Sequence, residues 1–298
     1  MANRGCTQQR RRSVAGKSVM RQRIHLGIST CPNDTFTFHA LMHRNVDWRG
    51  LDFNVELLDI QQLNDRLFAG DFDVAKVSFN AALQLADNFV VLPTGSALGF
   101  GVGPLLLSAK PGETPASKNQ ITLCPGENTT AALLFQLFYP DSTSIEHAVF
   151  SDIMPRLQQN QADFGVCIHE GRFTWQAAGL GLVEDLGTRW ETTTKSPLPL
   201  GGIIARKALG DDVVSTVQAV IFDSLQFALA DRNAPLPTMR QHAQEFSDDV
   251  LMQHVDLYVN EWTMDLGDVG RQALSELSQR AQTIGLTSTD CPEIQVFG

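Results

Sequence analysis

The sequence predicts an α/β protein of two lobes, in which each lobe is a mostly parallel sheet flanked by helices. Short apolar runs alternate with segments of helical period from residue 24 to residue 92, and the same alternation begins again at residue 105. This alternation is typical of parallel sheets, because each helix covers the sheet while the chain returns to start the next strand. After residue 206 the pattern is helical only, and we expect this part to pack back on the first lobe.

The elements follow in order from these patterns. In the first lobe we expect strands at 24–28, 53–58, 72–77 and 89–92, and helices at 34–42, 60–68 and 79–85. In the second lobe we expect strands at 105–107, 121–123, 145–150 and 164–168, helices at 130–138 and 153–159, and a further apolar stretch at 198–205. The final helices are expected at 213–230, 239–246, 249–259 and 269–284. Asn33 or Asp34 is the expected cap of the first helix.

The domain organisation follows from two chain crossings. We assign residues 22–98 and 206–298 to the first lobe, residues 99–205 to the second, and residues 1–21 to a disordered basic tail. The glycine-rich stretch from 99 to 104 is followed by proline and a strand, so we interpret it as a hinge or a closely packed crossing. Ligand sites lie at the carboxyl ends of parallel strands, and a two-lobed chain places such ends along a cleft.

Composition limits the class of function. The 298 residues carry 23 basic and 33 acidic side chains, a net charge of −10, which disfavours a nucleic-acid partner. No apolar run follows Arg10–Arg12 as a secretory signal requires, and no run is long enough to predict a membrane span. The five cysteines form no CxxC pair, which disfavours a thiolate zinc site or a disulfide framework. We therefore expect a cytoplasmic protein.

His169 is the candidate catalytic residue, because it ends the apolar strand at 164–168 and so faces the predicted cleft. An imidazole near neutral pKa is a natural general base. A structural histidine held by hydrogen bonds explains the same pattern equally well. A zinc site of the HExxH type is not indicated, since no second histidine has the required spacing. His39 and His43 share one helical face, which we expect to be exposed.

Three other strand ends carry polar groups suited to an anionic ligand. Lys76 and Ser78 end the strand at 72–77 and flank Val77, Asn33 follows the first strand, and Thr129, Thr130 and Ala131 begin a helix. A helix N-terminus stabilises a nearby anion, and a lysine can pair with a carboxylate. Plain helix capping and a lysine at a sheet edge are the alternatives. Cys31, Cys124 and Cys167 also fall near strand ends, where buried small residues are the simplest interpretation.

Several sequence motifs of this chain resemble motifs that occur together in one known family. Residues 29–36 (STCPNDTF), 76–78 (KVS), 97–104 (ALGFGVGP) and 168–173 (IHEGRF) resemble those of the 1,4-dihydroxy-6-naphthoate synthase family of the futalosine route to menaquinone. Residues 198–201 (LPLG), 247–248 (SD) and 254–260 (HVDLYVN) agree as well. The resemblance covers roughly residues 23–285.

The resemblance implies a fold, a reaction and site residues. It implies a fold like the type II periplasmic binding proteins, and a lyase that converts cyclic dehypoxanthinyl futalosine to 1,4-dihydroxy-6-naphthoate with release of dihydroxyacetone. The family's base falls on His169, and its substrate contacts fall on residues 76–78 and on Thr130 and Ala131. We expect a small-molecule carboxylate as substrate and no metal or redox cofactor.

Two alternatives remain at this point. Chorismate dehydratase shares the fold and pathway, but residues 31–34 (CPND) stand where a Tyr-Leu-Asn-type segment is expected for that enzyme. A binding protein without chemistry would also fit the fold class. The absence of a signal peptide and a histidine at the cleft argue against the latter.

Overall fold

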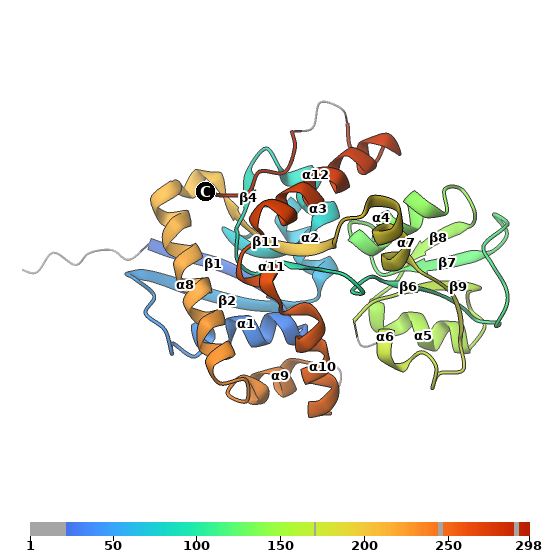
Figure 1. Ribbon diagram of the computed structural model, residues 1–298, viewed down its shortest axis with the longest axis horizontal. Helices are drawn as coiled ribbons and strands as arrows, with labels where there is room; N and C mark the ends of the chain where they lie inside the picture. The colour runs from blue at the N-terminus through green and yellow to red at the C-terminus, as the bar shows by residue number, and fades with distance from the viewer. Residues whose placement is uncertain (1–21, 170, 244–246, 289–291) are drawn as a thin grey trace, which may run out of the picture.

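A computed structural model describes residues 22–169, 171–243, 247–288 and 292–298 (Figure 1). The predicted tail at residues 1–21 lies outside these residues, as do residues 244–246 of the predicted helix at 239–246. Figure 1 shows two groups of elements joined by extended segments, with the C-terminal helices packed on the first group. The two-lobed fold class is thus confirmed.

The sheet of the first lobe has six strands. Its order is β2 (Leu51–Leu58), β1 (Gln22–Ser29), β3 (Val74–Ser78), β11 (Leu198–Arg206) and β4 (Phe89–Val91), and β5 (Ala97–Gly99) also pairs with β11. The first three strands are parallel, whereas β11 runs antiparallel to β3, β4 and β5. β3 therefore lies inside the sheet, so Lys76 is not at a sheet edge.

The sheet of the second lobe has five strands. Its order is β10 (Gly181–Asp185), β6 (Leu105–Ser108), β9 (Phe164–Cys167), β7 (Ile121–Cys124) and β8 (Ser144–His147). β7, β8 and β9 are parallel, and β6 and β10 are added antiparallel. Each sheet is therefore mixed and not mostly parallel as expected, because strands were added antiparallel to a parallel group of three. The carboxyl ends of the parallel groups deliver the loops considered below.

Helices cover both sheets. In the first lobe they are α1 (Pro32–Met42), α2 (Ile60–Phe68) and α3 (Phe79–Leu85), and in the second α4 (Thr130–Phe138), α5 (Phe150–Gln158), α6 (Gly171–Thr174) and α7 (Leu186–Thr194). The C-terminal part holds the short 3₁₀ helix η1 (Lys207–Leu209) and then α8 (Asp211–Ala230), α9 (Leu236–His242), α10 (Asp248–Tyr258), α11 (Glu261–Met264) and α12 (Gly267–Thr283). These helices lie beside the first sheet in Figure 1.

Two predictions about α1 are wrong. Its N-cap is Cys31, with Pro32 in the first turn, and no side chain makes a capping hydrogen bond there. Proline favours this first position because its missing N–H has no helical acceptor in any case. His39 is buried, and its Nδ1 lies 2.8 Å from Thr238 Oγ1, because α9 packs on this part of the helix. His43, the other histidine of that face, is exposed as expected.

α8 is the one helix in the described part of the chain that is long and apolar enough to cross a membrane. It packs against α1, and Val217, Val220 and Ile221 are fully buried in the core of the first lobe. Ser224 donates a hydrogen bond to Thr37 O of α1 at 2.6 Å. These contacts are those of a core helix, whose apolar composition follows from burial within the protein.

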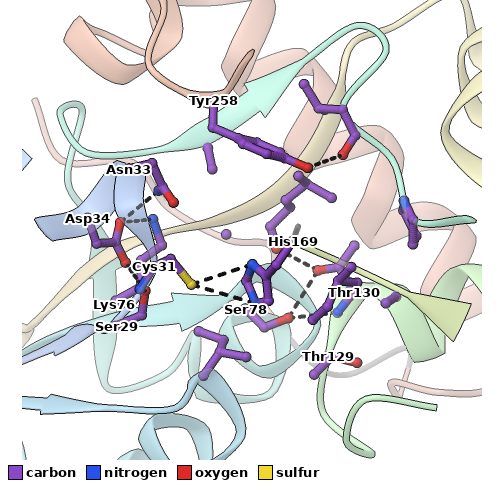
Figure 2. A pocket seen from close by; sticks show the side chains of 18 of the residues that line it. Ser29, Cys31, Asn33, Asp34, Lys76, Ser78, Thr129, Thr130, His169 and Tyr258 are labelled. Carbon is purple, nitrogen blue, oxygen red and sulfur yellow. Dashed lines mark hydrogen bonds and ion pairs between the residues drawn. The ribbon is translucent and has the colours of Figure 1, made fainter. Parts of the chain in front are cut away.

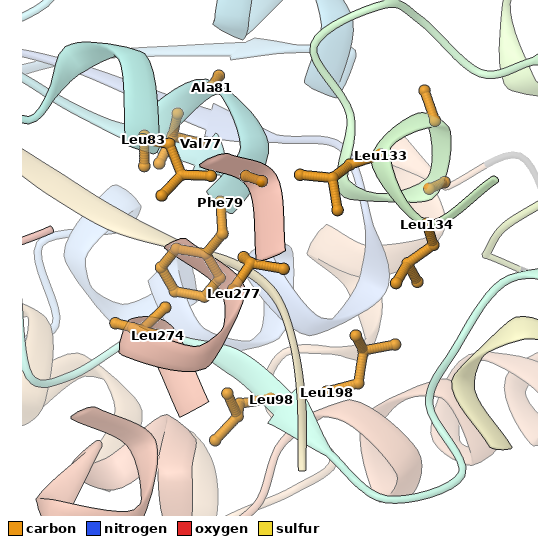
Figure 3. Close-up of a cluster of buried hydrophobic side chains, with 14 of the residues drawn as sticks. Val77, Phe79, Ala81, Leu83, Leu98, Leu133, Leu134, Leu198, Leu274 and Leu277 are labelled. Carbon is orange, nitrogen blue, oxygen red and sulfur yellow. The ribbon is translucent and has the colours of Figure 1, made fainter. Parts of the chain in front are cut away.

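One apolar cluster continues from the first lobe into the second. Phe79 of α3 and Leu277 of α12 belong to the same buried cluster as Leu133 and Leu134 of α4, and Figure 3 shows them around the crossing strands. Close-packed interiors resist rearrangement. The cluster therefore holds the start of α4 in a fixed position relative to the first sheet.

The glycine-rich stretch from 99 to 104 is a closely packed crossing, which is one of the two interpretations given above, the other being a hinge. A Cβ atom on Gly103 would lie 2.2 Å from the Cα of Gly187, so the two backbones touch without side chains between them. β5 begins before this crossing, and β11 starts at Leu198 in the first sheet. The lobe limits at 98/99 and 205/206 stay a prediction, because sheet pairing alone does not divide the chain into units.

Candidate active site

A cavity of about 100 Å³ lies where the loops of the two lobes meet (Figure 2). Its walls come from both sheets, from the starts of α1 and α4, and from α10. The eight residues predicted from the sequence all line it: Asn33, Lys76, Val77, Ser78, Thr129, Thr130, Ala131 and His169. The structure therefore brings together every predicted site residue, although their roles remain predictions.

His169 enters the cavity from the end of β9. Its backbone has a φ of 55°, in the left-handed region that non-glycine residues seldom adopt. Such backbone conformations are kept where the surrounding structure demands them. The ring is half-buried and packs edge-on against Phe150, with 4.7 Å between ring centroids. The backbone turn directs the imidazole across the cavity toward the first lobe.

Cys31 is a neighbour of His169 that the sequence argument missed. Its Sγ lies 3.5 Å from Nδ1 and 3.6 Å from Nε2 of His169, across the boundary between the lobes. The side chain is partly exposed to the cavity. Cys124 and Cys167, in contrast, are buried as expected, and burial raises the pKa of each thiol to about 12. Only Cys31 of these three lines the cavity.

Lys76 is already paired inside the protein. Its Nζ lies 2.7 Å from Asp34 Oδ1, and the two side chains are 6% and 2% exposed. Ser29 Oγ donates to the other oxygen, Asp34 Oδ2, at 2.6 Å. A buried pair of this kind is close to neutral toward its surroundings. Lys76 thus supplies hydrogen-bond donors to the cavity wall rather than an uncompensated positive charge.

The start of α4 offers a backbone donor to the cavity. Thr129 is the N-cap, and its Oγ1 accepts from Ala132 N. Thr130 N donates to Ser78 Oγ at 2.7 Å, which ties the helix to β3. In the described part of the chain, Ala131 N donates to no protein acceptor. The N-terminal end of a helix carries partial positive charge, so this wall suits an anion.

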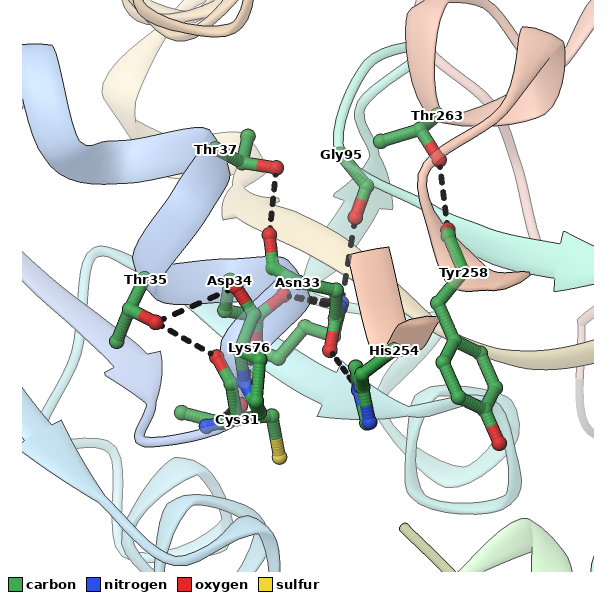
Figure 4. A network of polar contacts seen from close by, with 12 residues as sticks. Cys31, Asn33, Asp34, Thr35, Thr37, Lys76, Gly95, His254, Tyr258 and Thr263 are labelled. Carbon is green, nitrogen blue, oxygen red and sulfur yellow. Dashed lines mark hydrogen bonds and ion pairs between the residues drawn. The ribbon is translucent and has the colours of Figure 1, made fainter. Parts of the chain in front are cut away.

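His254 of α10 is a second cavity residue for which the sequence reasoning assigned no role. Its Nε2 lies 3.1 Å from Asn33 Oδ1, and Asn33 Nδ2 donates to Asp34 Oδ1 at 2.9 Å (Figure 4). Burial, followed by the charges of His169 and Lys76, holds the pKa of His254 well below its usual range. In the sequence, a lone histidine in an amphipathic helix resembles an ordinary core residue. The network of His254, Asn33 and Asp34 is therefore visible only in the folded structure.

Arg172 does not contact the His169 ring in the structure. It forms an ion pair with Asp185, with 2.7 Å between Nη2 and Oδ2, and it also donates to the backbone oxygen of Gly103. These contacts tie the short helix after His169 to β10 and to the glycine crossing. Glu170 lies outside the described residues. Cys31 is thus a polar neighbour of the His169 ring, beside the ring contacts with Phe150 and His254.

Solved structures with the same fold include solute-binding proteins. The ligand-binding component of an ABC-type import system from Staphylococcus aureus superposes with a TM-score of 0.67 and 16% identity, covering 92% of this chain and 97% of that one. The periplasmic aliphatic sulphonate-binding protein SsuA from Escherichia coli gives 0.61 and 11%, covering 93% and 94%. The chain therefore has a fold like that of the periplasmic binding proteins.

Sequence comparison narrows this class to one family. A profile described as "Menaquinone biosynthesis" matches residues 24–283. The 1,4-dihydroxy-6-naphthoate synthase of Thermus thermophilus is 38% identical over 265 residues, covering 89% of this chain and 96% of the relative. The enzyme of the same name from Streptomyces coelicolor is also 38% identical, over 280 residues, covering 92% and 98%. The chain belongs to the menaquinone biosynthesis family of 1,4-dihydroxy-6-naphthoate synthases.

Protein AF1704 from Archaeoglobus fulgidus is a further solved structure with this fold. It superposes with a TM-score of 0.83 and 27% identity, covering 89% of this chain and 98% of that one. This agreement extends over both lobes.

Proposed function

We propose that this chain catalyses the carbon–carbon lyase reaction of its family with His169 as general base. In this reaction cyclic dehypoxanthinyl futalosine yields 1,4-dihydroxy-6-naphthoate and dihydroxyacetone. The observation that carries the proposal is the position of the His169 ring, which lines a cavity shared by both lobes. A positioned imidazole accelerates proton transfer by about 10²–10⁴-fold.

The reaction begins with removal of a proton next to a carbonyl group. His169 accepts that proton, and the electron pair left on carbon forms a new double bond as the carbon–carbon bond to the three-carbon fragment breaks. The fragment leaves with the electron pair of the broken bond and takes up a proton to become dihydroxyacetone. Formation of the aromatic ring makes the cleavage favourable. Cys31 contacts the imidazole at 3.5 Å and helps to orient it. The cavity walls exclude bulk water and hold the substrate against the base.

The substrate carboxylate is assigned to the start of α4. Ala131 lines this part of the cavity at the positive end of the helix, and its N–H has no acceptor among the described residues. Lys76 lies on the adjoining wall, where Asp34 balances its charge. Charge-assisted hydrogen bonds from such donors offset the loss of the hydration of a carboxylate.

The test compares His169→Ala and His169→Gln with the unmodified protein. We expect both variants to fold and to bind the substrate. We expect kcat to fall by about 10²–10⁴-fold, because the proton acceptor is lost. Purified protein is incubated with cyclic dehypoxanthinyl futalosine, and naphthoate absorbance is followed. Near-normal turnover by either variant would remove His169 from the role of base.

The same assay separates the two other functions considered. A binding protein would retain the substrate unchanged, and a chorismate dehydratase would convert chorismate instead. The proposed location is the cytoplasm, and the proposed partner is the small carboxylate substrate. A cell-fractionation experiment tests the location directly.

A further inference from the structure

His254 is held in one orientation beside the base. Its ring lies 6.2 Å from that of His169 with 28° between the planes, and its other contact is Tyr258, 4.4 Å away. The residue is 2% exposed and lines the same cavity. A ring packed in this way has little freedom to rotate, so its two nitrogen atoms have fixed directions.

The polar chain behind His254 determines which nitrogen carries the proton. The Asp34 carboxylate pairs with Lys76 and can only accept hydrogen bonds. The amide nitrogen of Asn33 must therefore face Asp34, since a flipped amide would put its oxygen against the carboxylate. This leaves Asn33 Oδ1 facing His254, and an oxygen acceptor requires a proton on Nε2.

The surroundings of His254 also favour its neutral form. Burial is the largest cause that lowers its pKa, and the charges of His169 and Lys76 lower it further. A neutral imidazole with its proton on Nε2 has a lone pair on Nδ1. Among the described residues, none forms a hydrogen bond with Nδ1. The cavity therefore contains a fixed hydrogen-bond acceptor whose partner is not a described residue.

We propose that His254 is a specificity-determining residue whose Nδ1 accepts a hydrogen bond from a hydroxyl group of the substrate. This inference rests on the proposed function, whose substrate and three-carbon product carry hydroxyl groups. A neutral acceptor does not attract a carboxylate, so the anionic and hydroxylated parts of the substrate bind at different walls. His169, between the two, then faces the carbon that loses its proton.

Two variants separate the nitrogen atoms of His254. In His254→Asn the amide oxygen falls near the position of Nδ1, and the contact with Asn33 is lost. In His254→Gln the amide reaches the position of Nε2, and the acceptor at Nδ1 is lost. If His254 acts only by stabilising the fold through Asn33, His254→Gln should bind the substrate more tightly than His254→Asn. Our proposal predicts that His254→Asn binds the substrate more tightly.

The expected result is that KM rises about tenfold or more in His254→Gln and less than threefold in His254→Asn, with a smaller effect on kcat. Equal effects, or a larger effect in His254→Asn, would overturn the proposal. If the unmodified protein itself fails to convert cyclic dehypoxanthinyl futalosine, the proposed function fails instead. The two failures are therefore distinguishable.

A measurement on the unmodified protein does not depend on how the variants fold. Nitrogen-15 NMR of histidine-labelled protein reports the protonated nitrogen of each ring. We expect His254 to remain neutral with its proton on Nε2 from pH 8 to pH 6. A proton on Nδ1, or a doubly protonated ring at pH 7, would contradict the assignment.

Discussion

Asp34 changes what Lys76 contributes to the site. From the sequence, Lys76 was expected to pair with the substrate carboxylate, since a lysine at a strand end faces the cleft. The structure places Asp34 on its Nζ at 2.7 Å, and Ser29 and Asn33 donate to the same carboxylate. Lys76 is thus a member of a buried network, and its removal would leave a carboxylate without its counter-charge.

Replacing Lys76 by Ala is therefore expected to lower the free energy of unfolding by about 3–5 kcal/mol, the usual cost of breaking a buried ion pair. The matched control is the double variant Lys76→Met with Asp34→Asn, which removes both charges and should recover most of the stability. Urea unfolding followed by circular dichroism measures the difference. Equal stability of the single variant and the unmodified protein would show that the pair contributes little.

At the scale of elements, the contact of Gly103 with Gly187 joins the glycine crossing to α7. The backbones lie so close that a methyl group on Gly103 would enter the backbone of Gly187 at 2.2 Å. Backbone atoms cannot move aside as a flexible side chain can. The close approach of the two backbones therefore requires glycine at both positions. It also fixes the backbone oxygen of Gly103, to which Arg172 donates a hydrogen bond.

Gly103→Ala is expected to lower the free energy of unfolding by about 3 kcal/mol or more, as overpacking against a fixed backbone does. Gly101→Ala serves as the control two residues away. It has nothing within 4 Å of a new Cβ, and its φ of +70° alone should cost about 1–2 kcal/mol. Chemical unfolding of both variants provides the comparison, and a milder effect at Gly103 than at Gly101 would contradict the expectation.

Elements with strong periodicity were predictable from the sequence. The helix at 60–68 has the predicted bounds, and its end coincides with Gly70 at a φ of +81°. α7 was missed because its sequence ends in three threonines, which are poor helix formers. Thr193 and Thr194 bond back to the carbonyls of Arg189 and Trp190 within the helix. β10 was missed because most of its short sequence is partly exposed and lacks an apolar run.

The site residues that lie at strand ends were predictable from the sequence. Those that reach the cavity only through packing between distant parts of the chain were not. His169, Lys76 and Thr130 each follow a recognisable strand or begin a helix, and all line the cavity. Cys31 and His254 acquire their place only through partners far along the chain. Cys31 meets a residue 138 positions away, and His254 meets one 221 positions away. No local pattern encodes such contacts.

At the scale of the whole molecule, polar contacts join the lobes beside the shared apolar cluster. Asn80 of α3 donates to the backbone oxygens of Glu127 and Thr129, at 3.3 and 3.2 Å, just before α4 begins. Asn80 is 3% exposed. These bonds hold the proposed carboxylate wall against the first lobe, so the cavity is largely formed before the substrate arrives.

Asn80→Ala should raise KM about tenfold and destabilise the protein by about 1–3 kcal/mol, because the buried carbonyl of Thr129 and the part-buried carbonyl of Glu127 lose their donor. Gln84→Ala is the control, since Gln84 also bridges to the second lobe, through an exposed bond to Asn128 at 3.2 Å. We expect Gln84→Ala to lower the free energy of unfolding by less than about 0.5 kcal/mol. Steady-state kinetics and thermal unfolding of the two variants, compared side by side, check both expectations.

The mutual neutralisation of Lys76 and Asp34 has a consequence for how the ligand approaches. The chain as a whole carries a charge of −10, and Lys76, the lysine among the described residues of the cavity wall, is paired with Asp34. Dissolved ions weaken repulsion between like charges over distances of about 8–10 Å. Raising the ionic strength should therefore leave capture of the anionic substrate unimpaired, or favour it slightly, whereas a pocket with an uncompensated lysine would lose affinity under the same conditions.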